Sequence, residues 1–408
     1  MKPVSAAVAR VVRSTTLIAF LAFFTFTGVI PPGATHAQAQ TITDGLVGLL
    51  NNQTLQPGDV VKDQEAAVIT TQTVARALSI ELATIPVTSS AGGFVYRFNR
   101  SLAVVERASD SFGPFFAERA LRPGRHQTSL GWMLRYAEYT KLDGYALDEG
   151  TFITAANVRA GERRPFSVDR LSLRMTTRQI TGFGNYGITD RIDVGVAVPV
   201  VTLRVQGQRT NAVNGGIPVV QASVSDETTG LGDVALRGRI HLAGHGRAGL
   251  GAGADVRLPT GKEEDLLGAG KTALKMFGIG SFEGGRFAVH GNVGGTVGGL
   301  GREFNYNGAA TLAVAQHVTL VGEVLGRRVT NLAKVSPVYE PHPLVPDVTT
   351  MRWVPEGSAT HMVLLLAGFK VNVAQGFLLN ANVTFRPTTG GLSGQVVPGV
   401  ALDYSFGS

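Results

Sequence analysis

FLLNANVTFR, residues 377–386, alternates between two kinds of side chain. Its odd-numbered residues, from Phe377 to Phe385, are apolar, and the residues between them are mostly polar. Successive side chains of a strand point to opposite sides, so this pattern predicts a strand with one apolar face and one wet face. The same alternation recurs at 234–242, 286–297 and 362–372.

Segments of this kind fill most of the chain after residue 125. Each is near the ~9–11 residues that a tilted strand needs to cross a bilayer. The sequence predicts strands at 126–140, 168–186, 191–206, 231–243, 247–258, 271–283, 286–299, 303–315, 317–329, 360–373, 376–387 and 394–406.

The links between these segments alternate in length. The links after every second segment are tight turns, and on the opposite side long links occur at 141–167, 207–230, 259–270 and 330–359. Short turns on one side and long loops on the other are typical of an outer-membrane barrel, whereas a soluble β-sandwich has no such requirement. We therefore predict an all-β fold, an antiparallel transmembrane β-barrel of about 12 strands over residues 125–408, surrounded by outer-membrane lipid. Fourteen strands is the alternative, if 93–108 joins the barrel.

The composition agrees with this fold class. The chain of 408 residues has no cysteine, which excludes disulfides and thiolate metal sites. Only 16% of its residues are charged, against roughly 25% in an ordinary soluble domain. Many of its 52 glycines fall inside the predicted strands, where they permit bends and leave room in a lumen.

The N-terminus has the pattern of an export signal. Lys2, Arg10 and Arg13 precede the apolar run from Thr15 to Ile30, and Ala37-Gln38-Ala39 has the form of a cleavage site. We predict a cleaved signal peptide at residues 1–39 and an outer-membrane location; a membrane anchor is the alternative. Cleavage removes three positive charges and lowers the formal net charge from +7 to about +4.

Residues 40–124 differ in character from the barrel. SSAGGF and DSFGPFF are rich in glycine, serine and phenylalanine, and 92–124 contains a possible short hairpin. Two interpretations remain open for this segment. It is either a plug folded into the lumen or a periplasmic tail with an extra hairpin.

The inward faces of the predicted strands carry most of the charge. One interpretation is a lattice of arginine–carboxylate pairs that holds the barrel's shape. The other is a basic passage that favours anions or polar headgroups. Nucleic acid is not an expected partner, because the charge lies inside rather than on one outer face. The candidate lumen-lining residues are Arg174, Arg178, Asp193, Arg237, Arg239, His241, Asp255, Arg257, Arg286, His290, Lys370 and Arg386.

Motifs for covalent chemistry are incomplete. GAGKT at 268–272 has Asp265 where a phosphate-binding loop needs glycine, and GLSGQ at 391–395 does not complete a serine nucleophile elbow. The histidines form no zinc-binding pair of helical spacing. Glu263, Glu264 and Asp265 are read as a solvated loop rather than a calcium site. We therefore expect no catalytic residue, metal or cofactor, and no enzyme activity.

Three segments carry a resemblance to a known family. GLGDVALRGRIHL at 230–242, GLGAGADVRLPTGKEEDLLGAGKT at 249–272 and YGITDRIDVGVAVPVV at 186–201 resemble the outer-membrane transporters of the meta-pathway phenol-degradation family. The resemblance covers roughly residues 89–408. It implies a barrel that passes hydrophobic or aromatic compounds, and it specifies no substrate.

These observations give two expectations for function. The first is a channel or transporter for passive passage of small, hydrophobic or aromatic solutes. The second is a structural or adhesive barrel whose long loops, 141–167 and 330–359, bind partners. The C-terminal VALDYSFGS has the form of a strand read by the barrel-insertion machinery, although Gly407 and Ser408 follow its last aromatic residue.

Overall fold

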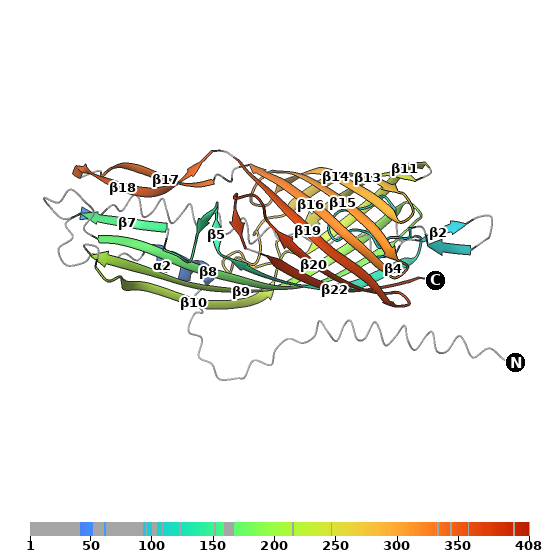
Figure 1. Cartoon of the computed structure of the whole chain (residues 1–408), viewed down its shortest axis with the longest axis horizontal. Helices are drawn as coiled ribbons and strands as arrows, with labels where there is room; N and C mark the ends of the chain where they lie inside the picture. The colour runs from blue at the N-terminus through green and yellow to red at the C-terminus, as the bar shows by residue number, and fades with distance from the viewer. Residues whose placement is uncertain are drawn as a thin grey trace, which may run out of the picture. The chain divides into compact units, whose positions relative to one another are not determined.

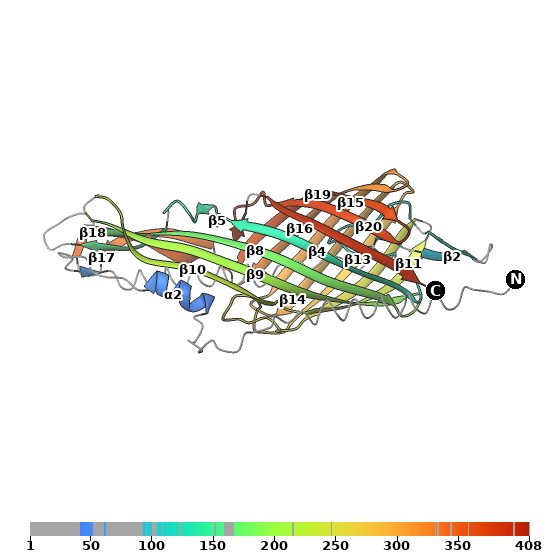
Figure 2. The same cartoon turned by 90° about the horizontal axis from the view of Figure 1, so that it is seen from below.

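The computed structural model describes residues 41–51, 61–62, 93–94, 96–99, 104–107, 109–121, 124–150, 152–158, 167–213, 216–245, 247–330, 332, 334–342, 345–357, 359–394 and 396–407. Within this part of the chain, twelve antiparallel strands close into a barrel (Figures 1 and 2). They are β4 (Gln127–Tyr139), β8 (Ser167–Gly187), β9 (Ile192–Val213), β11 (Ala235–His245), β12 (Ala248–Arg257), β13 (Ala273–Glu283), β14 (Phe287–Gly298), β15 (Glu303–Ala315), β16 (Val318–Thr330), β19 (Ala359–Ala374), β20 (Phe377–Phe385) and β22 (Val397–Gly407).

Closure comes from one pairing between strands distant in the sequence. The last strand, β22, pairs with the first, β4, with Leu402 opposite Trp132. β4 also pairs with β8 on its other side. β8 then pairs with β9, and β9 pairs with β11. All twelve predicted segments are confirmed. The short links after β8, β11, β13, β15 and β19 lie at one end, called here the short-turn end, and the long links lie at the other, the long-link end.

The outward face of the barrel is mostly apolar, although β8 exposes Arg174 and Arg178 toward the long-link end. Val293 is 57% exposed, Phe304 52% and Trp132 45%, whereas their strand neighbours on the other side point into the lumen. Exposing so many large apolar side chains is unfavourable in water and suits a surrounding of lipid. Not every aromatic side chain of the wall faces outward: Phe183 is buried and Tyr139 lines the lumen. Among the described residues, no helix is long and apolar enough to cross a membrane.

Several links predicted as loops contain strands. β9 continues past the predicted end at residue 206, and its outer half pairs with β10 (Val219–Leu231). Likewise β7 (Phe152–Val158) pairs with the start of β8, and β1 (Val61–Lys62) pairs with β7. β10 alternates only weakly in burial, which explains why its sequence resembles a polar loop.

An apolar core lies against the parts of β8 and β9 nearest the long-link end. Helix α2 (Ile42–Asn51) lies against β9 and β10, burying Ile42, Leu46 and Leu49 at the spacing of one helical face. Thr41 caps the helix: its hydroxyl accepts from the Asp44 amide at 3.1 Å, and the Asp44 carboxylate accepts from the Thr41 amide at 3.2 Å.

Smaller sheets lie outside the barrel wall. β17 (Lys334–His342) pairs with β18 (Val345–Glu356), and β5 (Lys141–Leu142) pairs with both β6 (Tyr145–Ala146) and β21 (Leu392–Ser393). Both figures place β17, β18, β7 and β10 at the long-link end.

The fourteen-strand alternative is wrong. β2 (Tyr96–Asn99) pairs only with β3 (Val104–Arg107) within the described residues, and this pair forms a separate two-stranded sheet. A four-residue strand is too short to cross a bilayer. The signal peptide at residues 1–39 lies outside the described residues, and so does much of 40–124, so both stay predictions.

Candidate functional site

Residues 109–121, called here the lumenal segment, occupy the short-turn half of the barrel interior. Each of residues 111–120 is buried, and none lies in a helix or strand. An irregular backbone in an interior must find hydrogen-bond partners from side chains. The barrel wall supplies them: Phe112 donates its amide to Thr319 at 3.1 Å, and Ala120 donates to Ser281 at 2.8 Å.

Glu323 on β16 holds the middle of the lumenal segment. Its carboxylate accepts amides from Phe116 and Ala117, each at 3.0 Å, and also from Phe115. Hydrogen bonds to a charged acceptor are about twice as strong as neutral ones. Three such donors on one side chain make Glu323 the strongest single attachment of the segment to the wall.

A second attachment comes from β19. Lys370 donates from Nζ to the carbonyl oxygen of Pro114 at 2.9 Å, and its ammonium lies 4.7 Å from the centre of the Phe115 ring. Gly368, on the same inward face, leaves space for that ring, because a Cβ there would be 2.9 Å from Phe115 Cε2. The glycine is therefore required for the close approach of the segment.

Glu118 ties the lumenal segment to a row of charges on the wall. One carboxylate oxygen pairs with Arg237 Nη1, and the other pairs with Arg239 Nη1 at 2.7 Å. Arg237 also holds Asp255, at 2.5 and 2.7 Å, and Arg239 holds Asp193 at 2.9 Å. Each of these five side chains is at most 14% exposed. The result is a continuous line of three carboxylates and two guanidiniums, Asp255–Arg237–Glu118–Arg239–Asp193.

Neutral side chains complete the attachment. Asn292 accepts the Glu118 amide at 2.6 Å and donates to the Glu118 carbonyl at 2.8 Å. Ser281, which accepts the Ala120 amide, also bonds His290 Nδ1 at 3.0 Å. His241 Nδ1 lies 3.2 Å from the Ala120 carbonyl oxygen. The short-turn half of the lumen is therefore filled by the chain itself.

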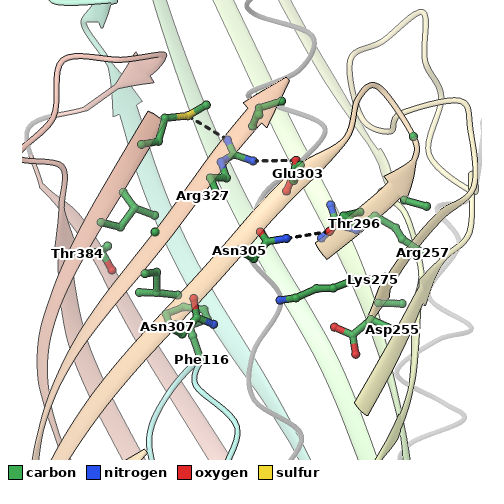
Figure 3. A pocket seen from close by; sticks show the side chains of 18 of the residues that line it. Phe116, Asp255, Arg257, Lys275, Thr296, Glu303, Asn305, Asn307, Arg327 and Thr384 are labelled. Carbon is green, nitrogen blue, oxygen red and sulfur yellow. Dashed lines mark hydrogen bonds and ion pairs between the residues drawn. The ribbon is translucent and has the colours of Figure 1, made fainter. Parts of the chain in front are cut away.

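A cavity of about 240 Å³ lies on the long-link side of the lumenal segment. Phe116 and Glu118 border it on the segment's side, and Leu392, Ser393 and Gly394 border it from the long links. Figure 3 shows that its walls carry both ionic and amide side chains, among them Lys275, Asn305 and Arg327. Apolar surface comes from such residues as Tyr139, Phe277, Leu325 and Leu364.

Close contacts between neighbouring strands shape part of the cavity wall. Gly253 on β12 faces inward, and a side chain there would clash with the ring of Phe277. Asn305 donates to Thr296 at 2.9 Å across β15 and β14, and Arg327 Nη1 lies 3.7 Å from Glu303 (Figure 3). This part of the wall is ordered by local pairs, whereas Arg237 is also held by Glu118 of the lumenal segment.

Nine of the twelve candidate residues point into the lumen. In the short-turn half and the middle, Asp193, Arg239, His241, His290 and Lys370 contact the lumenal segment or its partners. The remaining four line the cavity: Arg237, Asp255, Arg257 and Arg386. A role of these residues in transport stays a prediction.

The other three candidates do not line the lumen. Arg174 and Arg178 lie on the exposed face of β8, opposite the buried Leu173 and Thr177. The prediction chose the wrong face. In the part of β8 nearest the long links, the apolar side chains are the buried ones, and the arginines between them are exposed. Arg286 lies in the exposed turn between β13 and β14, where strand alternation no longer applies.

Sequence reasoning missed five charged residues of the cavity lining: Glu118, Arg135, Lys275, Glu303 and Arg327. Arg135 and Lys275 line the cavity from β4 and β13. Both lie in stretches of alternating polarity, from which their inward position could have been predicted. Glu118 lies in a segment without periodicity, so no sequence signal pointed to it. The described residues include no cluster of three or more His, Asp or Glu side chains able to hold a metal ion.

The comparisons with known proteins give distant likenesses only. The sequence matches no protein-family profile and no curated protein. An outer membrane channel from Pseudomonas putida F1 matches 69% of this chain and 96% of its own, with 11% identity and a TM-score of 0.45. The CymD monoaromatic hydrocarbon channel matches 70% of this chain and 90% of its own, with 11% identity and a TM-score of 0.35. The NanC porin matches 68% of this chain and 99% of its own, with 6% identity and a TM-score of 0.33. The assignment as a twelve-stranded barrel rests on the strand pairing itself.

Proposed function

We propose that this protein is an outer-membrane channel for the passive passage of small, hydrophobic or aromatic compounds. The observation that carries the proposal is the cavity inside a closed barrel with a lipid-compatible outer face. Its aromatic and aliphatic walls give a small apolar solute a place to leave water, and its amide and charged groups fix orientation. The resemblance to transporters of the meta-pathway phenol-degradation family supports the same class of solute and stays a prediction.

The lumenal segment acts as the plug in this proposal. A solute that enters from the long-link end meets Phe116 and Glu118 as the floor of the cavity. Onward passage requires a shift of residues 109–121, whose attachments are hydrogen bonds and ion pairs that water can replace. No residue performs covalent chemistry in this mechanism, and no cofactor takes part.

Filling the cavity tests the proposal. Ala137 lines the cavity from β4 and is buried, whereas Leu134 on the same strand is exposed on the outward face. Ala137→Trp should reduce uptake of an aromatic solute, and Leu134→Trp is the matched control. Uptake is measured in cells with a lipopolysaccharide outer membrane, because hydrophobic solutes cross phospholipid bilayers unaided.

The result distinguishes a passage from a scaffold. We expect uptake with the wild-type protein and with Leu134→Trp, and a loss of most of it with Ala137→Trp at equal amounts of folded protein. Uptake equal to that of cells without the protein would refute the proposed function. Equal uptake by all three proteins would show that solutes do not use this cavity.

A second function is favoured by the folded links at the long-link end. Trp353 of β18 is buried and lies 4.8 Å from the Tyr145 ring of β6, so links distant in sequence share one core. Ordered links present a fixed surface, as an adhesive barrel requires. Deleting 334–356 should abolish binding of cells to a partner surface if this function holds, and should leave solute uptake unchanged.

The insertion machinery of the outer membrane is the proposed partner during assembly. On β22, Val400, Leu402, Tyr404 and Phe406 share the outward face. Tyr404 stacks between Phe377, at 4.3 Å, and Phe406, at 5.3 Å. An apolar, aromatic last strand of this form is what the machinery is expected to read.

A further inference from the structure

The charge of the cavity lining is unbalanced. Six basic residues line it, against three acidic ones: Glu118, Asp255 and Glu303. Charges in a narrow, partly dry space interact more strongly than in water. An excess of cations there favours an anion inside the cavity.

Part of this excess is already neutralised within the wall. Arg237 holds both Asp255 and Glu118, and Arg327 lies 3.7 Å from Glu303. Arg386 donates to the Gly390 carbonyl oxygen at 2.7 Å. These three cations already have partners, so they are not the groups with spare binding capacity.

Lys275 has no such partner. Its ammonium lies 5.3 Å from the centre of the Phe277 ring, and within the described part of the chain it makes no hydrogen bond or ion pair. Asp255, beside it in register, is held by Arg237 instead. Figure 3 shows Lys275 extending from β13 into the space below Asn305. A half-buried ammonium that makes no hydrogen bond or ion pair within the described part of the chain can donate to an anion that enters the cavity.

Arg135 is the second cation of this kind. Its guanidinium lies 5.4 Å from the centre of the Phe116 ring. Its Nε and Nη1 atoms are buried and have no hydrogen-bond partner among the described residues. β8, β9, β11 and β12 separate β4 from β13 in the sheet, so Arg135 and Lys275 come from different walls of the cavity. Each cation stacks on its own aromatic ring.

We infer that the cavity binds small organic anions that join an apolar body to a carboxylate, such as aromatic carboxylates. The carboxylate accepts hydrogen bonds from Lys275 or Arg135, and the apolar body packs on Phe116, Phe277 and Leu325. This inference rests on the proposed function, because it names a substrate class for the same passage. It assigns to Lys275 and Arg135 a role in selecting solutes rather than in holding the barrel together.

Equilibrium dialysis of the purified, folded protein tests the inference independently of transport. The probes are radiolabelled benzoate, benzyl alcohol as its neutral counterpart, and acetate as an anion with little apolar surface. We expect benzoate to bind about tenfold or more tightly than either of the other two, since hydrogen bonds to a charged group contribute about that much. This comparison uses the wild-type protein and depends on no variant.

Variants then locate the site. Lys275→Gln and Arg135→Gln should each weaken benzoate binding by about tenfold and leave benzyl alcohol binding nearly unchanged. Lys275→Arg should retain benzoate binding. Arg178→Gln, on the exposed face of β8, is the matched control and should bind as the wild type does.

The outcomes separate the two proposals. Benzoate bound no more tightly than benzyl alcohol, or bound equally by the wild type and both Gln variants, would overturn the inference while uptake of neutral aromatics still supports the channel. Selective benzoate binding by a protein that mediates no uptake in cells would support the inference and refute the proposed function.

Discussion

The two halves of the lumen are built from the same alternating strands, and they treat charge in opposite ways. In the short-turn half, Glu323 and Glu118 each receive several partners from the lumenal segment or the wall. In the long-link half, Lys275 and Arg135 face a cavity and stack only on aromatic rings. The first arrangement suits a packed interior, and the second suits a space that another molecule enters.

Inward-facing charged side chains therefore have different roles in the two halves of this barrel. Buried ion pairs are costly to desolvate and strongly destabilising once one partner is removed. Residues of the short-turn half therefore act mainly on stability and closure. Residues of the cavity lose little when changed, so their effects should appear in selectivity.

The largest expected effect comes from Arg239→Gln. The change leaves Glu118 and Asp193 buried with one partner fewer, at a cost of about 3–5 kcal/mol. The temperature at which the folded band converts to the unfolded band on a gel should fall clearly below that of Arg178→Gln. An unchanged conversion temperature would show that the line of charges does not stabilise the barrel.

Glu323→Gln should have the next largest effect, on closure rather than on folding. The neutral side chain loses the charge that accepts three amides of the lumenal segment, weakening its attachment by about 1–3 kcal/mol. Conductance in a planar bilayer should rise, and protease should cut within 109–121. Arg178→Gln, on the exposed face of β8, serves as the control and should keep the wild-type conductance. Equal conductance of both variants would contradict a plug held by Glu323.

Arg327→Gln should change selectivity more than stability. Its pair with Glu303 is long, at 3.7 Å, so its loss should destabilise the barrel less than loss of the close pairs of Arg239. The reversal potential in a salt gradient should shift toward cation preference, because the cavity loses one positive charge. A shift toward anions, or a large fall in stability, would place Arg327 with the structural residues.

Arg174→Gln should have the smallest effect. Arg174 is 55% exposed and pairs with Glu138 at 3.5 Å and Asp148 at 3.6 Å. Exposed pairs of this kind contribute about 0.5 kcal/mol or less. Neither the conversion temperature nor the reversal potential should change. A marked change in selectivity would mean that Arg174 lies on the solute's path after all.

The strands of the wall were predictable from sequence because lipid and lumen impose a period of two on every one of them. FLLNANVTFR shows this directly, and its apolar residues do face outward. The inward positions of Arg237, Arg239 and Lys370 follow from the same period. Along β10 the period is weak, so a loop was predicted there. On the part of β8 nearest the long links the period holds, but its apolar face is the buried one, so the predicted face was wrong.

The sequence by itself determined the barrel, its twelve spanning segments and most of the inward charge, since each is a local consequence of alternation, whereas the choice between twelve and fourteen strands came from the structure. Only the tertiary structure decided which charges are paired, because ion pairs join residues far apart in the chain. Glu118 meets Arg237 and Arg239 more than a hundred residues away, and no period in its own segment announces the contact. The division of the lumen into a filled half and a cavity arises from that folding of 109–121 into the barrel.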